Sequence, residues 1–205
     1  MSAATHRALI ILAAGNSSRL GQPKQQLMFQ EKNLLERAIQ AGRESPVRSI
    51  WVVLGAHHQE ILQQSDLQGA RTVIHQDWKL GMGSSIKAGL NAVLEDELPD
   101  EVILMLCDQP FVDGKLLSRL VSVRQDTGKG MVACSYSGTL GVPVLFQQAF
   151  FSLLLDMDDA SGAKKLLKAH QQDLAVVPFE QGSIDIDTAE DYQQLLAIQK
   201  GERDP

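Results

Sequence analysis

The stretch ALIILAAGNSSRLGQPK, residues 8–24, decides the fold. Its first five residues are all apolar, which is typical of a strand that is buried on both faces of a sheet. The chain then turns through small and polar residues, where Gly15 and Gly21 permit backbone angles and close approaches that a Cβ would forbid. A buried strand that enters a glycine-containing turn predicts the first unit of an alternating β and α fold.

The turn itself has the composition of an anion-binding loop. Backbone N–H groups in such a loop can point at an anion, and Arg19 and Lys24 add a forked and a point cation. It is not a P-loop, because that motif ends in Gly-Lys-Ser/Thr and this one ends in Gly-Gln-Pro-Lys. We interpret it as a loop that wraps a nucleoside triphosphate, an ordinary strand-to-helix turn being the alternative. The residues predicted to bind the nucleotide here are Leu12, Ala13, Ala14, Gly15, Ser17, Ser18, Arg19 and Lys24.

Composition limits the class of protein. With 205 residues, 44% hydrophobic and 21% charged, we expect a soluble globular protein with a single domain over 1–205 and frayed ends at 1–6 and 200–205. A net charge of −6 argues against a nucleic-acid partner, and no apolar run is long enough to indicate a membrane partner. Cys107 and Cys134 lie near apolar runs, so we predict buried free thiols in a reducing cytoplasm.

Further apolar runs predict more strands, and apolar stripes at helical spacing separate several of them. The predicted α/β fold has a mainly parallel sheet with helices on both faces. Ligands of such sheets bind at the carboxyl ends of the strands. A last helix is expected to start at Thr188, with Asp191 at its third position. The further predicted strands are 50–54, 71–74, 102–106, 131–134, 143–146 and 174–177.

Two places offer carboxylates for a metal ion. Asp108 directly follows the strand 102–106, where a carboxylate points into the ligand crevice. Mg²⁺ beside a triphosphate prefers one or two carboxylates plus phosphate oxygens; a turn-capping role before Pro110 is the alternative. Asp185 and Asp187 share one face of an extended segment, so one of them could complete the site, with helix capping as the alternative for Asp187.

Two further segments have the composition of binding loops. Glycines and serines at 81–85 precede a helix, which favours an anion or base edge at Gly83, Ser84 and Ser85, or simply a capped loop. The segments 141–143 and 159–164 are candidates for the second substrate, since Lys164 and Lys165 sit at a helix start where cations are not favoured unless an anion faces them. A solvated face is the alternative. The residues predicted to bind the acceptor are Gly141, Pro143, Gly162 and Lys164.

Taken together, these motifs resemble the MobA-like nucleotidyltransferases, and within them the molybdenum cofactor cytidylyltransferase branch. The resemblance spans almost the whole chain in the expected order. It is specific for the superfamily and much less so for the acceptor. The matching segments are 12–24, 81–85 with 88–90, 106–110, 141–146, 161–164 and 185–188.

The resemblance implies a Rossmann-like fold of the nucleotide-diphospho-sugar transferase type and Mg²⁺-dependent transfer of a nucleotidyl group to a phosphorylated acceptor. It implies that the first loop holds the triphosphate and base, and that Asp108 binds the metal with Asp187 as second ligand. We hypothesise an in-line displacement in which Arg19, Lys24 and Asp108 are the catalytic residues. Relatives that use GTP tend to carry Leu-Ala-Gly-Gly in the first loop, whereas Ala13-Ala14-Gly15 favours CTP. The implied partners are a molybdopterin-type acceptor and a molybdoenzyme that receives the product.

Three positions depart from the pattern of that branch. Val142 stands where His is often found, Lys164 where Arg is common, and His75 where Asn is frequent. Alternative functions are a related transferase that uses GTP or another phosphorylated small molecule, such as a sugar or polyol phosphate, and a pterin carrier without chemistry. An NAD-dependent oxidoreductase is disfavoured because no Gly-x-Gly-x-x-Gly follows the first strand.

Overall fold

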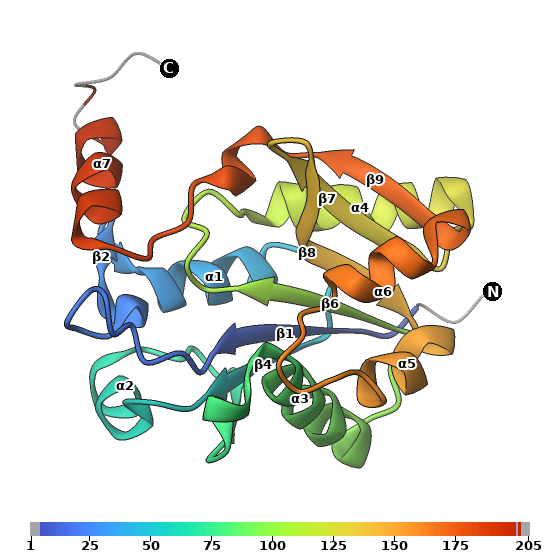
Figure 1. Cartoon of the computed structure of the whole chain (residues 1–205), viewed down its shortest axis with the longest axis horizontal. Helices are drawn as coiled ribbons and strands as arrows, with labels where there is room; N and C mark the ends of the chain where they lie inside the picture. Colours follow the sequence, from blue (N-terminus) through green and yellow to red (C-terminus); the bar gives the residue numbers. More distant parts are fainter. Residues whose placement is uncertain (1–4, 200, 202–205) are drawn as a thin grey trace.

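The computed structural model describes residues 5–199 and 201, and its centre is a seven-stranded sheet in the order β5-β4-β1-β6-β8-β7-β9 (Figure 1). A separate two-stranded ribbon pairs β2 with β3. The strands are β1 (Arg7–Ala13), β2 (Met28–Phe29), β3 (Lys32–Asn33), β4 (Ser49–Leu54), β5 (Arg71–Ile74), β6 (Glu101–Leu106), β7 (Met131–Tyr136), β8 (Thr139–Gln147) and β9 (Leu174–Pro178).

The sheet is mainly parallel, as predicted, with one exception. β5, β4, β1 and β6 run parallel, and β9 runs parallel to β7. β8 is antiparallel to both of its neighbours, β6 and β7. Only Ser137 and Gly138 join β7 to β8, and both have the positive φ that a two-residue hairpin turn favours. The short turn forces the chain to reverse there.

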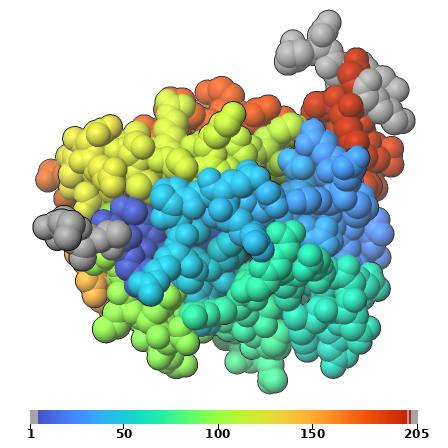
Figure 2. All heavy atoms as spheres, turned by 180° about the vertical axis from the view of Figure 1, so that it is seen from behind, coloured from blue at the N-terminus to red at the C-terminus, as the bar shows by residue number. Residues whose placement is uncertain are grey.

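Helices cover both faces of the sheet, as the alternating pattern predicts. The helices are α1 (Leu34–Arg43), α2 (His58–Gln64), α3 (Met82–Asp96), α4 (Gly114–Thr127), α5 (Phe151–Leu155), α6 (Lys164–Ala169) and α7 (Ala189–Gln199). Successive side chains of β1 point to opposite faces. Leu9 and Ile11 pack in a core with α1 and α4, whereas Ile10 and Leu12 pack in a core with α3 and α5. From behind, the blue-to-cyan atoms of α1 lie across the middle of the molecule, below the yellow-green atoms of α4 (Figure 2).

A small third core ties the last segment back to the front of the chain. Ile186, just before α7, and Leu195, within α7, pack with Leu27, Phe29 and Leu34 beside β2. Ile186 is fully buried, and its N–H donates to the backbone carbonyl of Asp108 at 3.1 Å. In Figure 1, α7 stands in red beside β2 at one end of the sheet. This packing brings residues 185–188 to the carboxyl ends of β1 and β6.

Two further predictions concern fraying at the chain ends and the state of the two cysteines. His6, inside the stretch expected to fray, donates its N–H to Asp100 Oδ2 at 2.7 Å, so ordered structure already includes it. Residues 1–4, 200 and 202–205, on which most of that expectation falls, lie outside the described residues. Cys107 and Cys134 are buried and free, as predicted. Within the described residues, no helix is both long and apolar enough to cross a bilayer.

Candidate functional site

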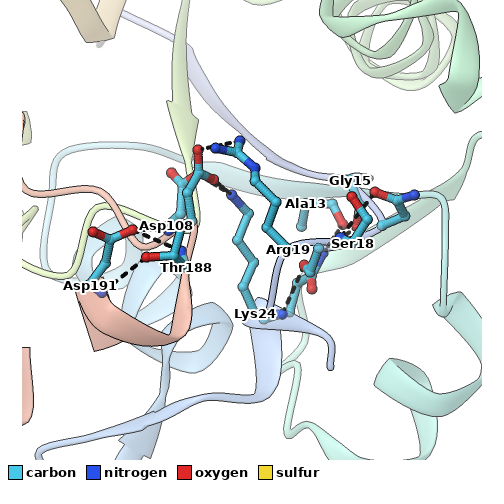
Figure 3. A network of polar contacts seen from close by, with 12 residues as sticks. Ala13, Gly15, Ser18, Arg19, Lys24, Asp108, Thr188 and Asp191 are labelled. Carbon is cyan, nitrogen blue, oxygen red and sulfur yellow. Dashed lines mark hydrogen bonds and ion pairs between the residues drawn. The ribbon is translucent and has the colours of Figure 1, made fainter. Parts of the chain in front are cut away.

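Three charged side chains from distant parts of the chain meet at the carboxyl ends of β1 and β6. The Nζ atom of Lys24 lies 2.6 Å from Asp108 Oδ2 and 2.8 Å from Asp187 Oδ1. Arg19 contacts the other oxygen of Asp187, with 2.9 Å between Nη2 and Oδ2. Figure 3 shows the extended Lys24 side chain reaching the carboxyl groups. We call Lys24, Asp108 and Asp187 the charged trio.

Each member of the charged trio is placed by a different local feature. Asp108 is the second residue after β6, and Lys24 begins the short 3-10 helix Lys24–Gln26 after Pro23. Asp187 is released from the capping role that was its alternative, because Thr188 and Asp191 cap the helix reciprocally. Asp191 Oδ2 accepts from Thr188 N at 2.8 Å, and Thr188 Oγ1 accepts from Asp191 N at 3.2 Å. The carboxylate of Asp187 therefore remains for the cations.

The pKa directions follow from this geometry. Burial alone would lower the pKa of Lys24, but the charge of Asp108 and hydrogen bonds to both carboxylates outweigh it and raise the pKa. The hydrogen bond from Lys24 lowers the pKa of Asp187, and Arg19 adds to the effect. Burial and the charges of Asp108 and Asp187 raise the pKa of Asp185. Asp187 is thus the carboxylate that the cations stabilise, whereas at Asp185 burial and the neighbouring carboxylates outweigh the charge of Lys24.

The charged trio fits a divalent cation. The ammonium of Lys24 lies between the two carboxylates that the sequence predicts as metal ligands. The second oxygen of Asp108, Oδ1, is buried and has no hydrogen-bond partner among residues 5–199 and 201, which suits a cation there. Among the described residues no group of three or more His, Cys, Asp or Glu side chains is arranged to hold a metal. Two carboxylates completed by phosphate oxygens is the arrangement that Mg²⁺ usually accepts.

A cavity of about 240 Å³ opens beside the charged trio, and we call it the nucleotide-side cavity. Its wall contains the start of the first loop, residues 12–15, together with Lys24 and Asp108. Of the serines and glycine predicted at the start of α3, Ser85 lines the cavity. The remaining lining residues are Gln25, Trp78, Gly81, Met82, Leu106 and Cys107.

Other residues predicted to bind the nucleotide lie outside that wall and support it. Ser17 Oγ accepts from the backbone N–H of Lys24 at 3.0 Å, and so closes the loop, whereas Ser18 is exposed. Ser84 Oγ donates to Gly81 O at 2.7 Å and contacts His75 Nε2 at 2.9 Å. Gly83 is needed for packing, because a Cβ there would lie 2.2 Å from the carbonyl oxygen of Asp158.

Gln25 is a site residue that the sequence pattern did not indicate. Its side chain is fully buried, and Nε2 donates to the carbonyls of Ala13 at 2.7 Å and Gly15 at 3.3 Å. These bonds fix the first loop against the segment that carries Lys24. A polar residue next to Lys24 was the available signal, but nothing in local periodicity shows that a glutamine is buried.

A second cavity, of about 230 Å³, adjoins the first, and we call it the acceptor-side cavity. Gly141, Gly162 and Lys164 line it, whereas Pro143, the fourth residue predicted on this side, does not. Met82 and Leu106 line both cavities and so mark where they meet. The other lining residues are Tyr136, Thr139, Leu140, Val142, Val144, Ala163 and Leu167.

Residues 9–174 match the family described as the MobA-like NTP transferase domain, which covers most of the chain. The chain belongs to the MobA-like NTP transferase family. Its fold is the nucleotide-diphospho-sugar transferase type, as the resemblance implied. Family membership makes the protein a nucleotidyltransferase by superfamily.

Relatives of this family member carry different names at similar identity. The chain is 27% identical to a nicotine blue oxidoreductase of Paenarthrobacter nicotinovorans, over 91% of this chain and 95% of that protein. It is 26% identical to the molybdenum cofactor cytidylyltransferase of Escherichia coli, over 89% and 92%. Among solved structures, Rv0371c of Mycobacterium tuberculosis in complex with manganese superposes with a TM-score of 0.78 at 24% identity, covering 94% and 98%. The fold and the family are therefore established, and the differing names of the relatives assign no acceptor to this chain.

Proposed function

We propose that the protein transfers CMP from CTP to the phosphate of a molybdopterin-type molybdenum cofactor and releases pyrophosphate. The observation that carries this proposal is the charged trio beside the nucleotide-side cavity, with Lys24 Nζ 2.6 Å from Asp108 and 2.8 Å from Asp187. Cations and carboxylates at one edge of a small-residue loop suit a triphosphate with its metal. The resemblance to cytidylyltransferases at Ala13-Ala14-Gly15, where relatives that use GTP tend to carry Leu-Ala-Gly-Gly, favours CTP as donor.

The reaction is an in-line displacement. An oxygen of the acceptor phosphate attacks the α-phosphorus of CTP, and the bond from that phosphorus to the bridging oxygen breaks, so pyrophosphate leaves. A phosphate nucleophile is already ionised near neutral pH, so the chain needs no general base. Catalysis is then positioning and charge neutralisation.

The residues of the chain divide this work. Lys24 and Arg19 move from the carboxylates to the phosphates and stabilise the charge that grows on the leaving pyrophosphate. Asp108 and Asp187 would hold Mg²⁺, which would supply positive charge to neutralise the phosphates. Gln25 keeps the first loop in place through the carbonyls of Ala13 and Gly15. Lys164 meets an anionic group of the acceptor at the acceptor-side cavity.

The setting of this activity is part of the proposal. Two buried free thiols agree with a reducing cytoplasm. The product nucleotide would pass from this protein to a molybdoenzyme.

Pyrophosphate release tests the proposal directly. The protein is incubated with Mg²⁺ and a molybdopterin-type cofactor, and CTP, GTP, ATP and UTP are compared, each with a control that lacks the cofactor. Cofactor-dependent release with CTP alone is the expected result. Release with GTP alone would show that the donor is GTP and not CTP. Release only when a sugar or polyol phosphate takes the place of the cofactor would show that the proposed acceptor is wrong. Stoichiometric binding of the cofactor with no release from any nucleotide would favour the carrier.

A further inference from the structure

Tyr136 stands at the end of β7 and lines the acceptor-side cavity, and its ring is fixed by two glycines. A Cβ at Gly141 would lie 2.0 Å from the Tyr136 hydroxyl oxygen, and a Cβ at Gly182 would lie 2.3 Å from ring atom Cδ1. Backbone therefore contacts both the hydroxyl end and the edge of the ring. Close packing of this kind leaves the ring a single position.

Gln109 determines how the hydroxyl of Tyr136 bonds. The side chain of Gln109 is buried, and Nε2 donates to the carbonyl of Gly182 at 3.0 Å and to the hydroxyl oxygen of Tyr136 at 3.3 Å. Since Nε2 can only donate, Tyr136 accepts this bond. Within the described part of the chain, the hydroxyl hydrogen of Tyr136 has no acceptor of its own. The cavity wall thus carries a hydrogen-bond donor that is oriented but unpaired.

The surroundings of this donor are mostly apolar. Apart from Tyr136, the polar side chains that line the acceptor-side cavity are Thr139 and Lys164. A sugar or polyol would bring several hydroxyls into contact with apolar side chains, and each unpaired polar group costs about 1–3 kcal/mol. A flat heteroaromatic ring carries its polar atoms at its edges, so its two faces can pack on the apolar wall while an edge meets the polar side chains. The apolar side chains of the wall are Met82, Leu106, Leu140, Val142, Val144 and Leu167.

We propose that Tyr136 contacts the ring body of the acceptor as a hydrogen-bond donor, that Gln109 positions it, and that this cavity selects a flat heteroaromatic ring over a sugar or polyol. The inference rests on the proposed function in one respect, that the acceptor binds on this side of Met82. It adds a residue pair and a ring class that the family match does not assign. Neither residue takes part in moving the nucleotidyl group.

The test uses a probe that lacks any phosphate. Pterin is titrated into nucleotide-free protein and its binding is followed by fluorescence, with glucose 1-phosphate as the competing sugar phosphate. We expect pterin to bind the native protein, and Tyr136→Phe to weaken binding about 10-fold, since the change removes one hydrogen bond and keeps the ring. Tyr192→Phe is the matched control, because Tyr192 donates to Met28 O at the α7 edge and leaves the cavity untouched.

A second pair of variants separates positioning from packing. Gln109→Leu should weaken pterin binding in the native background and have no further effect in Tyr136→Phe protein, because Gln109 acts through the hydroxyl. Additive losses would show that Gln109 only supports the fold. Equal pterin affinity of native and Tyr136→Phe protein, absence of pterin binding, or displacement of pterin by glucose 1-phosphate at lower concentration would each overturn the proposal.

Kinetics with the complete cofactor separate a failure of the Tyr136 proposal from a failure of the proposed CMP transfer. With the complete cofactor, Tyr136→Phe should raise KM for the acceptor and leave KM for CTP and kcat close to native values. If the native protein binds pterin through Tyr136 but releases no pyrophosphate, the reaction fails and the ring site stands. If it releases pyrophosphate with unchanged acceptor KM in Tyr136→Phe, the reaction stands and the role of Tyr136 fails.

Discussion

The two cavities that meet at Met82 and Leu106 are of similar volume and differ in the charged side chains that line them. The nucleotide-side cavity lies at the carboxyl ends of the parallel strands β1 and β6 and contains the charges of Lys24 and Asp108. The acceptor-side cavity lies against the antiparallel hairpin β7–β8, and Lys164 is its one charged lining residue. Charge can hold any triphosphate, whereas an apolar wall with a few oriented polar groups discriminates between ring shapes. The proposed function therefore predicts that residues of the first cavity set the reaction class and residues of the second select the acceptor.

The largest expected effect concerns Asp108, because the contrast between the two cavities requires the charged residues of the nucleotide-side cavity for turnover. Asp108→Asn keeps the shape of the side chain and removes its charge, so turnover should fall by about 10²–10³-fold. Steady-state pyrophosphate release measures the loss, and circular dichroism checks that the fold is kept. Asp113→Asn is the matched control, since an amide still caps α4 and the residue lies away from both cavities. Native turnover in folded Asp108→Asn protein would remove Asp108 from the metal site.

Lys24 can be tested through the affinity of the nucleotide-side cavity for a metal ion. Its ammonium occupies the place between Asp108 and Asp187, so Lys24→Met should bind Mn²⁺ severalfold more tightly than native protein when no nucleotide is present. The variant should still lose most turnover, because the charge on pyrophosphate is no longer met. Electron paramagnetic resonance of free Mn²⁺ gives the affinity, and exposed Lys115→Met serves as the control. Weaker Mn²⁺ binding by Lys24→Met would show that the ammonium does not compete with the metal.

Two glycines test the acceptor side. Gly141→Ala would place its Cβ 2.0 Å from the Tyr136 hydroxyl oxygen, whereas Gly162→Ala would place its Cβ 3.1 Å from the flexible Met82 Sδ. We expect Gly141→Ala to raise acceptor KM and to destabilise the fold by about 1–3 kcal/mol, as overpacking does. Gly162→Ala should change both much less, and neither variant should change KM for CTP. Equal effects of the two variants, measured by kinetics and urea unfolding, would argue against a rigid ring at Tyr136.

The smallest effect concerns Asp185, where burial and the charges of Asp108 and Asp187 outweigh the charge of Lys24. Its pKa is raised, so the ionised carboxyl costs stability above that pKa, and the cost disappears when both folded and unfolded states are protonated. Asp185→Asn should therefore raise the free energy of unfolding slightly at pH 7, and the gain should vanish below about pH 3. Urea unfolding across this pH range measures it. A gain of the same size at both pH values would mean that the charge is not its source.

Local patterns in the sequence predicted much of the fold. Apolar runs marked the strands of the large sheet, because a strand buried on both faces has few polar residues. The capping box at Thr188 and Asp191 formed as expected, since its donors and acceptors are three residues apart. The prediction of a mainly parallel sheet did not include the reversal at β8, which depends on the two-residue turn at Ser137 and Gly138.

The candidate site was predicted less evenly. The first loop and Asp108 were found because they follow buried strands directly, where ligands of such sheets bind. Gln25 and Tyr136 were missed, since their importance comes from single hydrogen bonds and from burial that no periodicity encodes. Gly83 and Ser84 were predicted to bind nucleotide, and in the structure they pack against residues 158 and 81 beside the cavity.

The sequence by itself determined the strands, the helix caps and the identity of the charged residues, because these depend on neighbours within a few positions. Only the tertiary structure decided which charges meet, since the partners of Lys24 are 84 and 163 residues away along the chain. It also decided that Asp187 rather than Asp185 faces the cations, through the anchoring of Ile186 on Asp108. Contacts at that separation are fixed by the packing of the whole sheet and its helices, which no local pattern contains.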